Sequence, residues 1–159
     1  MLIKKIILPK LPQELIEDVR NTIEVSRNVA FDGQNSRLTD EFGSYYSWYI
    51  PSELLQTWCH KNISPDIFFG IQVIAGRMPM HKDFGPTPDS RTELKFNYII
   101  DTGGDNVVTN YYSDDKELIE SHILAPGIWY MLNVRVNHDV QNIEIGQQRI
   151  AITGRILPS

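Results

Sequence analysis

The 159-residue sequence has little cysteine, no long apolar run and no cluster of basic residues. Cys59 is the one cysteine, so no disulfide can form within the chain, and a reducing, cytoplasmic location fits. We expect its thiol to be buried in a short helix. No apolar stretch approaches the roughly 20 residues that cross a bilayer, so no membrane partner is expected.

The formal net charge is −5, from 20 acidic and 15 basic residues. Proteins that bind a nucleic-acid backbone usually gather lysines and arginines into a patch or stripe. This sequence has no such stripe, which argues against nucleic acid as a partner. It also lacks a Ser-His or Cys-His pattern typical of covalent hydrolases.

Residues 1–65 predict a support region for a larger β core. Leu15, Val19 and Ile23 recur at helical spacing, with acidic residues on the opposite side, which predicts an amphipathic helix. The expected elements are a strand at 2–8, a helix from Pro12 to about Asn28, a loop at 31–43, a strand at 44–50 and a helix capped by Ser52.

Residues 66–156 consist of short β-rich runs separated by glycine, proline and aspartate turns. Such spacing predicts an antiparallel barrel or sandwich, and we expect residues 1–159 to form one domain around it. The expected strands are 67–74, 92–100, 106–112, 118–124, 128–136 and 149–156.

The pair His81 and Asp83 is the strongest local signal for a site. Residues two apart on an extended segment point to the same side, so both can bind one cation. Taken alone, the pair is more often a surface histidine beside a turn. His138, much later in the chain, supplies a second imidazole. Two imidazoles and one carboxylate on one face form the triad that suits non-haem iron(II).

Arg149 lies on a late strand, eleven residues after His138. Along this strand Arg149, Ala151, Thr153 and Arg155 share one face, opposite the apolar face. An arginine that points into a barrel needs an anion, and its planar guanidinium matches a dicarboxylic acid. A salt bridge to a neighbouring strand is the alternative for Arg149, and Arg155 is a rival anion binder.

These residues together resemble the iron(II)/2-oxoglutarate-dependent oxygenase superfamily, in particular its prolyl hydroxylase-like and related small members. The resemblance covers about residues 66–156, with His-x-Asp at His81 and Asp83, the distal histidine at His138 and the late arginine at Arg149. It implies a mainly β protein with N-terminal helices, built on a double-stranded β-helix, the jelly-roll or cupin-like barrel. It further implies iron(II) on the triad and 2-oxoglutarate paired with Arg149.

The sequence departs from the family pattern at two positions near the expected cosubstrate site. Many members have serine two residues after the arginine, where this chain has Ala151, and many have tyrosine where this chain has Gln72. Gln72 could donate its amide to the same carboxylate, or it could be an ordinary strand residue. Lys95 and Asn97 lie on a strand with one face toward the metal, and the sequence leaves open which face that is.

The resemblance implies an oxygenase that uses O₂ and 2-oxoglutarate, hydroxylates a small molecule or a protein or amino-acid side chain, and releases succinate and CO₂. One alternative is a non-catalytic β-helix module that retains ligand-like residues. Another is a cupin dioxygenase without 2-oxoglutarate, although cupins usually use more histidines than the four present here. We expect His60 and His122 to be structural or exposed. Residues 31–43 and 84–91 are the candidate lid segments.

Overall fold

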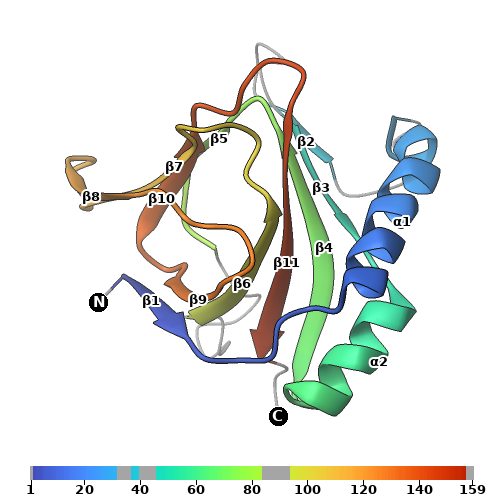
Figure 1. Ribbon diagram of the computed structural model, residues 1–159. Helices are drawn as coiled ribbons and strands as arrows, with labels where there is room; N and C mark the ends of the chain where they lie inside the picture. Colours follow the sequence, from blue (N-terminus) through green and yellow to red (C-terminus); the bar gives the residue numbers. More distant parts are fainter. Residues whose placement is uncertain (1, 32–36, 40–45, 84–93, 157–159) are drawn as a thin grey trace.

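The computed structural model describes residues 2–31, 37–39, 46–83 and 94–156. Within them, seven strands form a larger antiparallel sheet and four form a smaller one, and Figure 1 shows the two sheets facing each other. The larger sheet has the order β1 (Ile3–Ile6), β9 (Trp129–Asn133), β6 (Leu94–Asp101), β11 (Gln148–Ile156), β4 (Ile67–Ala75), β3 (Tyr46–Ile50), β2 (Arg37–Thr39). The smaller sheet has the order β5 (Met78–His81), β10 (Asn137–Gln141), β7 (Val108–Tyr112), β8 (Leu118–His122).

Two helices, α1 (Gln13–Phe31) and α2 (Glu53–Asn62), cover the outer face of the larger sheet (Figure 1). The helical spacing of Leu15, Val19 and Ile23 points them at this sheet, where all three are buried. Alternate residues of β4 and β11 meet them there. Neither helix is apolar enough over a sufficient length to span a membrane. The second helix also buries Cys59, and burial raises the pKa of its thiol to about 12, as expected of a structural cysteine.

The second helix is also joined to β4 by hydrogen bonds. The Gln56 side chain accepts from the Phe69 backbone N–H at 2.7 Å and donates to the Ile67 carbonyl at 3.2 Å. These backbone groups lie beyond the end of β3, whose pairing with β4 stops at Ile71. Gln56 therefore provides hydrogen-bond partners for two backbone groups of β4 that β3 does not reach.

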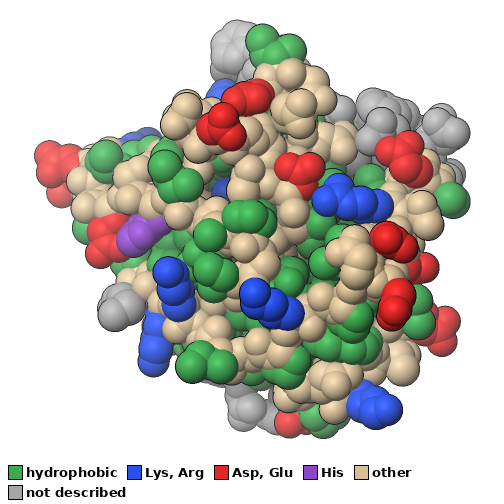
Figure 2. Space-filling view, in the orientation of Figure 1, with side chains coloured by type: hydrophobic (Ala, Val, Ile, Leu, Met, Phe, Trp, Pro, Cys, Tyr) green, Lys and Arg blue, Asp and Glu red, His purple; other side chains and the backbone are tan. Residues whose placement is uncertain are grey.

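The inner faces of the two sheets pack together at both ends and leave a cavity between them. One buried cluster contains Ile99, Tyr111, Tyr130 and Leu132, and another contains Ile74, Met78, Val107, Val140 and Ile143. This arrangement is the double-stranded β-helix that the sequence motifs implied. Figure 2 shows acidic and basic side chains interspersed over the visible face rather than gathered by sign.

Most predicted elements are present, but β5 was not among the expected strands, and there are three further differences. Residues 37–39, expected in a loop, pair with β3 and form β2. The other residues of the first candidate lid from 32 to 43, and the second candidate lid at 84–91, lie outside the described residues. The first helix continues to Phe31, beyond the predicted end. His138 lies within its own short strand, β10, which the sequence did not indicate.

The close contact between β11 and β4 at Gly154 gives a test of the packing under the helices. A Cβ at Gly154 would lie 2.7 Å from the Phe69 ring, whereas one at Gly70 on β4 would meet nothing closer than 3.8 Å. Gly154→Ala should lower the free energy of unfolding by about 1–3 kcal/mol because the core is overpacked. Gly70→Ala should lower it less, as chemical denaturation can measure. Equal losses for the two variants would contradict this packing.

Candidate metal centre and its cavity

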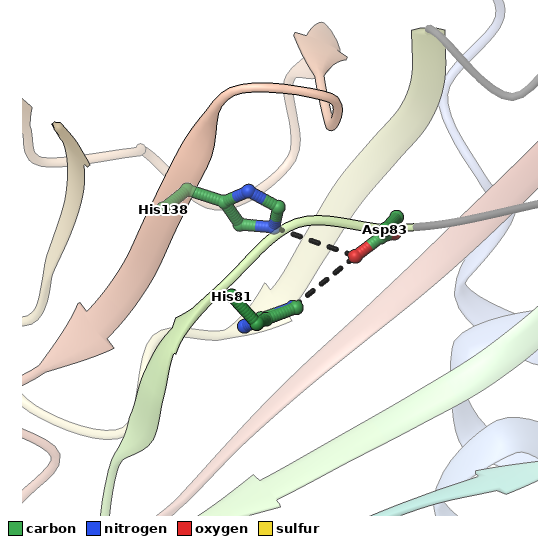
Figure 3. Close-up of side chains that lie close together, drawn as sticks. All are labelled: His81, Asp83 and His138. Atoms are coloured by element: carbon green, nitrogen blue, oxygen red, sulfur yellow. Dashed lines mark ion pairs between the residues drawn. The ribbon is translucent and has the colours of Figure 1, made fainter. Parts of the chain in front are cut away.

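The structure brings His81, Asp83 and His138 together on the smaller sheet and at its edge (Figure 3). The Nε2 atom of His81 lies 3.1 Å from Asp83 Oδ1, and Nε2 of His138 lies 3.6 Å from the same oxygen. One ligand atom from each residue lies within 4.8 Å of the other two. All three side chains are partly or fully shielded from solvent.

Strand pairing positions the two imidazoles. His81 ends β5 and is the direct register partner of His138 on β10, so both side chains project on the same side of the sheet. Asp83 follows two residues after His81. Its backbone N–H donates to the Val134 carbonyl at 2.8 Å, which holds it at the sheet edge beside both histidines.

Each imidazole is oriented by its own strand. Nδ1 of His81 lies 2.8 Å from the Pro79 carbonyl, and Nδ1 of His138 lies 2.8 Å from the Val136 carbonyl. A carbonyl only accepts, so both Nδ1 atoms carry the proton and both Nε2 atoms of the neutral rings present lone pairs. Three acceptor atoms then converge on one point, an arrangement that is satisfied by a cation.

The pKa directions of Asp83 and His138 favour an ionised carboxylate and a neutral imidazole, the forms that bind a metal. Burial raises the pKa of Asp83, but the hydrogen bond that His81 donates in its protonated, metal-free form and the charges of Lys95 and the imidazoles outweigh it and lower this pKa to about 2. Burial lowers the pKa of His81, yet its hydrogen bonds raise it overall. Burial lowers the pKa of His138. Asp83 is therefore ionised, and a nitrogen and oxygen donor set of this kind suits a transition metal.

These three residues open onto a cavity of about 440 Å³ between the sheets. Arg149 of β11 lines it and is only 4% exposed. Its Nη1 donates to Thr109 Oγ1 at 3.0 Å, and burial lowers the pKa of the guanidinium to about 10. The alternative of a strand-to-strand salt bridge for Arg149 is not found among the described residues. Gly103, in the left-handed region at φ +83°, lets its turn approach the Arg149 backbone, where a Cβ would lie 3.0 Å from N.

Two buried polar atoms near the cavity have no hydrogen-bond partner within the described residues: Asn97 Oδ1 and the Tyr111 hydroxyl. Tyr111 is the register partner of His138, with ring centroids 5.8 Å apart, and Asn97 lines the cavity. Buried polar atoms are nearly always satisfied, so the Tyr111 hydroxyl could donate to a ligand oxygen, whereas Asn97 Oδ1 can only accept from a donor. Tyr111 was not among the candidate site residues, because a tyrosine on a strand carries no sequence signal of its partner.

Arg155 and Gln72 also reach this cavity, but in different ways. Arg155 is far from Arg149 along β11, and its Nη2 lies 3.6 Å from Asp83 Oδ2, so it contacts the triad directly. Gln72 lies in the cavity wall, 9% exposed, beside Ala151 in the sheet. The sequence could place Arg155 on the correct face of its strand but could not identify its partner.

The remaining polar residues singled out in the sequence lie elsewhere. His60 lies in the last turn of α2, and its Nε2 contacts the Ile67 carbonyl of β4 at 3.0 Å. His122 Nε2 lies 2.7 Å from the Glu120 carboxylate on the same strand, β8. Neither belongs to the metal-ligating group found among the described residues.

No protein-family model matches the sequence, and no curated protein sequence matches it. Solved structures do resemble its fold. A prolyl-4-hydroxylase from Pseudomonas putida matches with a TM-score of 0.58 and 11% identity, covering 99% of this chain and 92% of that one. An oxidoreductase of the 2OG-Fe(II) oxygenase family from Burkholderia pseudomallei matches at 0.53 and 14%, covering 91% and 82%.

A third match is a non-haem, α-ketoglutarate-dependent carbocyclase from nogalamycin biosynthesis, with a TM-score of 0.61, 11% identity and coverage of 91% and 75%. At these identities the likeness establishes the fold. These structures are described as a prolyl-4-hydroxylase, a 2OG-Fe(II) oxygenase and an α-ketoglutarate-dependent carbocyclase, in agreement with the double-stranded β-helix that the sequence motifs implied.

The convergence of three acceptors predicts stoichiometric metal binding. Asp83→Ala and His138→Ala should each abolish it, because the two remaining side chains no longer surround the ion. Calorimetric titration with cobalt(II) measures this, and thermal unfolding checks that the variants fold. His122→Ala, which removes the other histidine of a His-carboxylate pair, is the matched control and should bind fully. Full affinity in both triad variants would contradict the assignment.

Proposed function

We propose that this chain is an iron(II)- and 2-oxoglutarate-dependent oxygenase. It hydroxylates a small molecule or a protein or amino-acid side chain and releases succinate and CO₂. The observation that carries the proposal is the combination, in one cavity, of a three-acceptor metal centre and a buried arginine that donates a hydrogen bond to a neutral hydroxyl. The first suits an open-sided divalent metal, and the second requires an anion.

His81, Asp83 and His138 hold the metal, and the backbone carbonyls of Pro79 and Val136 keep the two rings turned toward it. Iron(II) bound there would supply the activation of O₂ and the oxidative decarboxylation of 2-oxoglutarate. The protein residues keep the three donor atoms on one side, so coordination positions on the cavity side stay open for the reactants.

Arg149 pairs with the distal carboxylate of 2-oxoglutarate, to which its planar guanidinium can donate two parallel hydrogen bonds. Thr109 accepts one N–H of the guanidinium and thereby fixes its orientation. The Tyr111 hydroxyl, unpaired and close to His138, is available to donate to the cosubstrate oxygens. An arginine so deeply buried would be destabilising unless an anion joined it.

Apolar side chains form much of the remaining wall and keep water from the reacting groups. Ile74 and Val140 lie on facing sheets, and Leu132 and Val134 come from β9 and the segment after it. A dry wall strengthens the charge interactions of Asp83 and Arg149 and protects reactive species from solvent. No general base from the protein is needed for this chemistry.

We also propose that residues 1–159 form one domain. A cytoplasmic location fits its single cysteine, which is buried and free. The overall negative charge argues against a polyphosphate substrate. A non-catalytic β-helix module is the second reading. Stoichiometric iron without turnover of 2-oxoglutarate would favour it.

The iron-loaded protein should convert 2-oxoglutarate to succinate slowly even without a primary substrate. Arg149→Ala should weaken 2-oxoglutarate binding by roughly 2–4 kcal/mol, about 30- to 700-fold, because it removes one partner of a buried charge pair. Arg155→Ala should weaken it less. Calorimetry measures the binding and mass spectrometry the succinate. The reverse order of the two arginines, or an absence of succinate from a fully iron-loaded sample, would contradict the proposal.

A further inference from the structure

A second group of cations lies in the cavity, away from Arg149. Lys95 on β6 is 6% exposed and directly opposes Arg155 on β11 in the strand register. Its Nζ donates to the Tyr49 hydroxyl at 2.9 Å, and both Lys95 and Arg155 lie over the Tyr49 ring, at 5.2 and 5.8 Å from its centroid. Six residues along a strand, roughly 20 Å, separate Arg155 from Arg149.

The ammonium of Lys95 is buried with a neutral hydroxyl as its hydrogen-bond partner. Taking a lysine ammonium out of water costs several kcal/mol unless an anion accompanies it. Among the described residues that line the cavity, Asp83 is the one carboxylate. Its oxygens face the two imidazoles and Arg155, and with a metal bound its charge is shared with the ion.

The charges of the cavity are therefore unbalanced even after the proposed ligands are added. Four cations line it: Lys82, Lys95, Arg149 and Arg155. The Lys82 ammonium pairs at 2.9 Å with exposed Asp114, outside the cavity lining. The two carboxylates of 2-oxoglutarate would meet Arg149 and, together with Asp83, the divalent metal. Buried Lys95 and half-exposed Arg155 have Asp83 as their one carboxylate among the described lining residues, and its single charge is shared with the divalent metal, so positive charge is left in excess.

A second, more apolar hollow of about 420 Å³ continues from this pair along the inner face of the larger sheet. It shares Tyr49 and Arg155 with the metal cavity. Its remaining wall is small or apolar, from Ile50, Pro51, Phe68, Gly70 and Thr153. Arg155 thus stands where the metal cavity meets a hollow that suits hydrocarbon, and Lys95 lies beside it on the side of the metal cavity.

We propose that the primary substrate is a small organic acid whose carboxylate binds between Lys95 and Arg155 and whose apolar body lies in the hollow beside Phe68 and Gly70. This inference rests on the proposed function for the reaction, but the carboxylate site itself needs neither metal nor 2-oxoglutarate. Arg155 also contacts Asp83, so the clamp holds the acid next to the metal centre.

The test uses hexanoate and its neutral counterpart hexanamide on the full, metal-free chain at constant ionic strength, with dissociation constants from NMR titration. Hexanoate should bind at least tenfold more tightly than hexanamide. Lys95→Met should reduce hexanoate binding to the level of the amide. Lys82→Met is the matched control, because it removes a cavity lysine that is already paired, and it should leave hexanoate binding unchanged.

Equal binding of acid and amide would overturn the inference. So would loss of hexanoate binding in Arg149→Met together with its retention in Lys95→Met, since the acid would then occupy the cosubstrate arginine. If Lys95→Met fails to fold, Lys95→Arg should retain the preference and Arg155→Gln should lose it, and retention in Arg155→Gln would overturn the inference. Succinate formation is measured separately, so its absence contradicts the proposed function and not this site.

Discussion

His81 and His138 face each other because β5 pairs with β10 in one particular register, and the candidate site depends on that pairing. A shift by one residue would turn one imidazole to the opposite face of the sheet. The same pairing leaves Asp83 at the edge of the sheet, where its backbone binds Val134 and its carboxylate reaches both rings. Carbonyl partners at each Nδ1 then fix the tautomer, so the ligand geometry is set by the backbone before any ion binds.

Charge is the second constraint, and the opposite sheet supplies it. Arg149, Arg155 and Lys95 all belong to the larger sheet, whereas His81 and His138 belong to the smaller one. The cavity therefore has basic side chains on the wall formed by the larger sheet and potential metal ligands on the wall formed by the smaller sheet. Burial of the charges of Arg149 and Lys95 costs stability, and the anionic ligands that we propose would offset this cost. The two helices, which reinforce the outer face of the larger sheet, hold that wall in place.

The sequence predicted what short-range patterns encode. Alternation placed Arg149 and Arg155 on one face of a strand, and the His-x-Asp spacing placed His81 and Asp83 on one side. It left the direction of Lys95 open, because Lys95 and Asn97 alternate with apolar residues on β6 as they would on a strand with a solvent-facing side, yet here the polar side faces the cavity. Contacts between distant segments, such as Lys95 with Tyr49 or Arg155 with Asp83, depend on sheet order and curvature, which local sequence does not specify.

We propose that one cavity binds iron(II) and 2-oxoglutarate together, in contact with each other. The most direct measurement is a visible absorption spectrum of the anaerobic protein, recorded with iron(II) alone and then with 2-oxoglutarate added. A weak charge-transfer band that appears only when both are present is the predicted result, because it requires the keto acid to chelate the bound metal. A folded protein that binds iron(II) stoichiometrically and develops no such band at saturating 2-oxoglutarate would contradict the account.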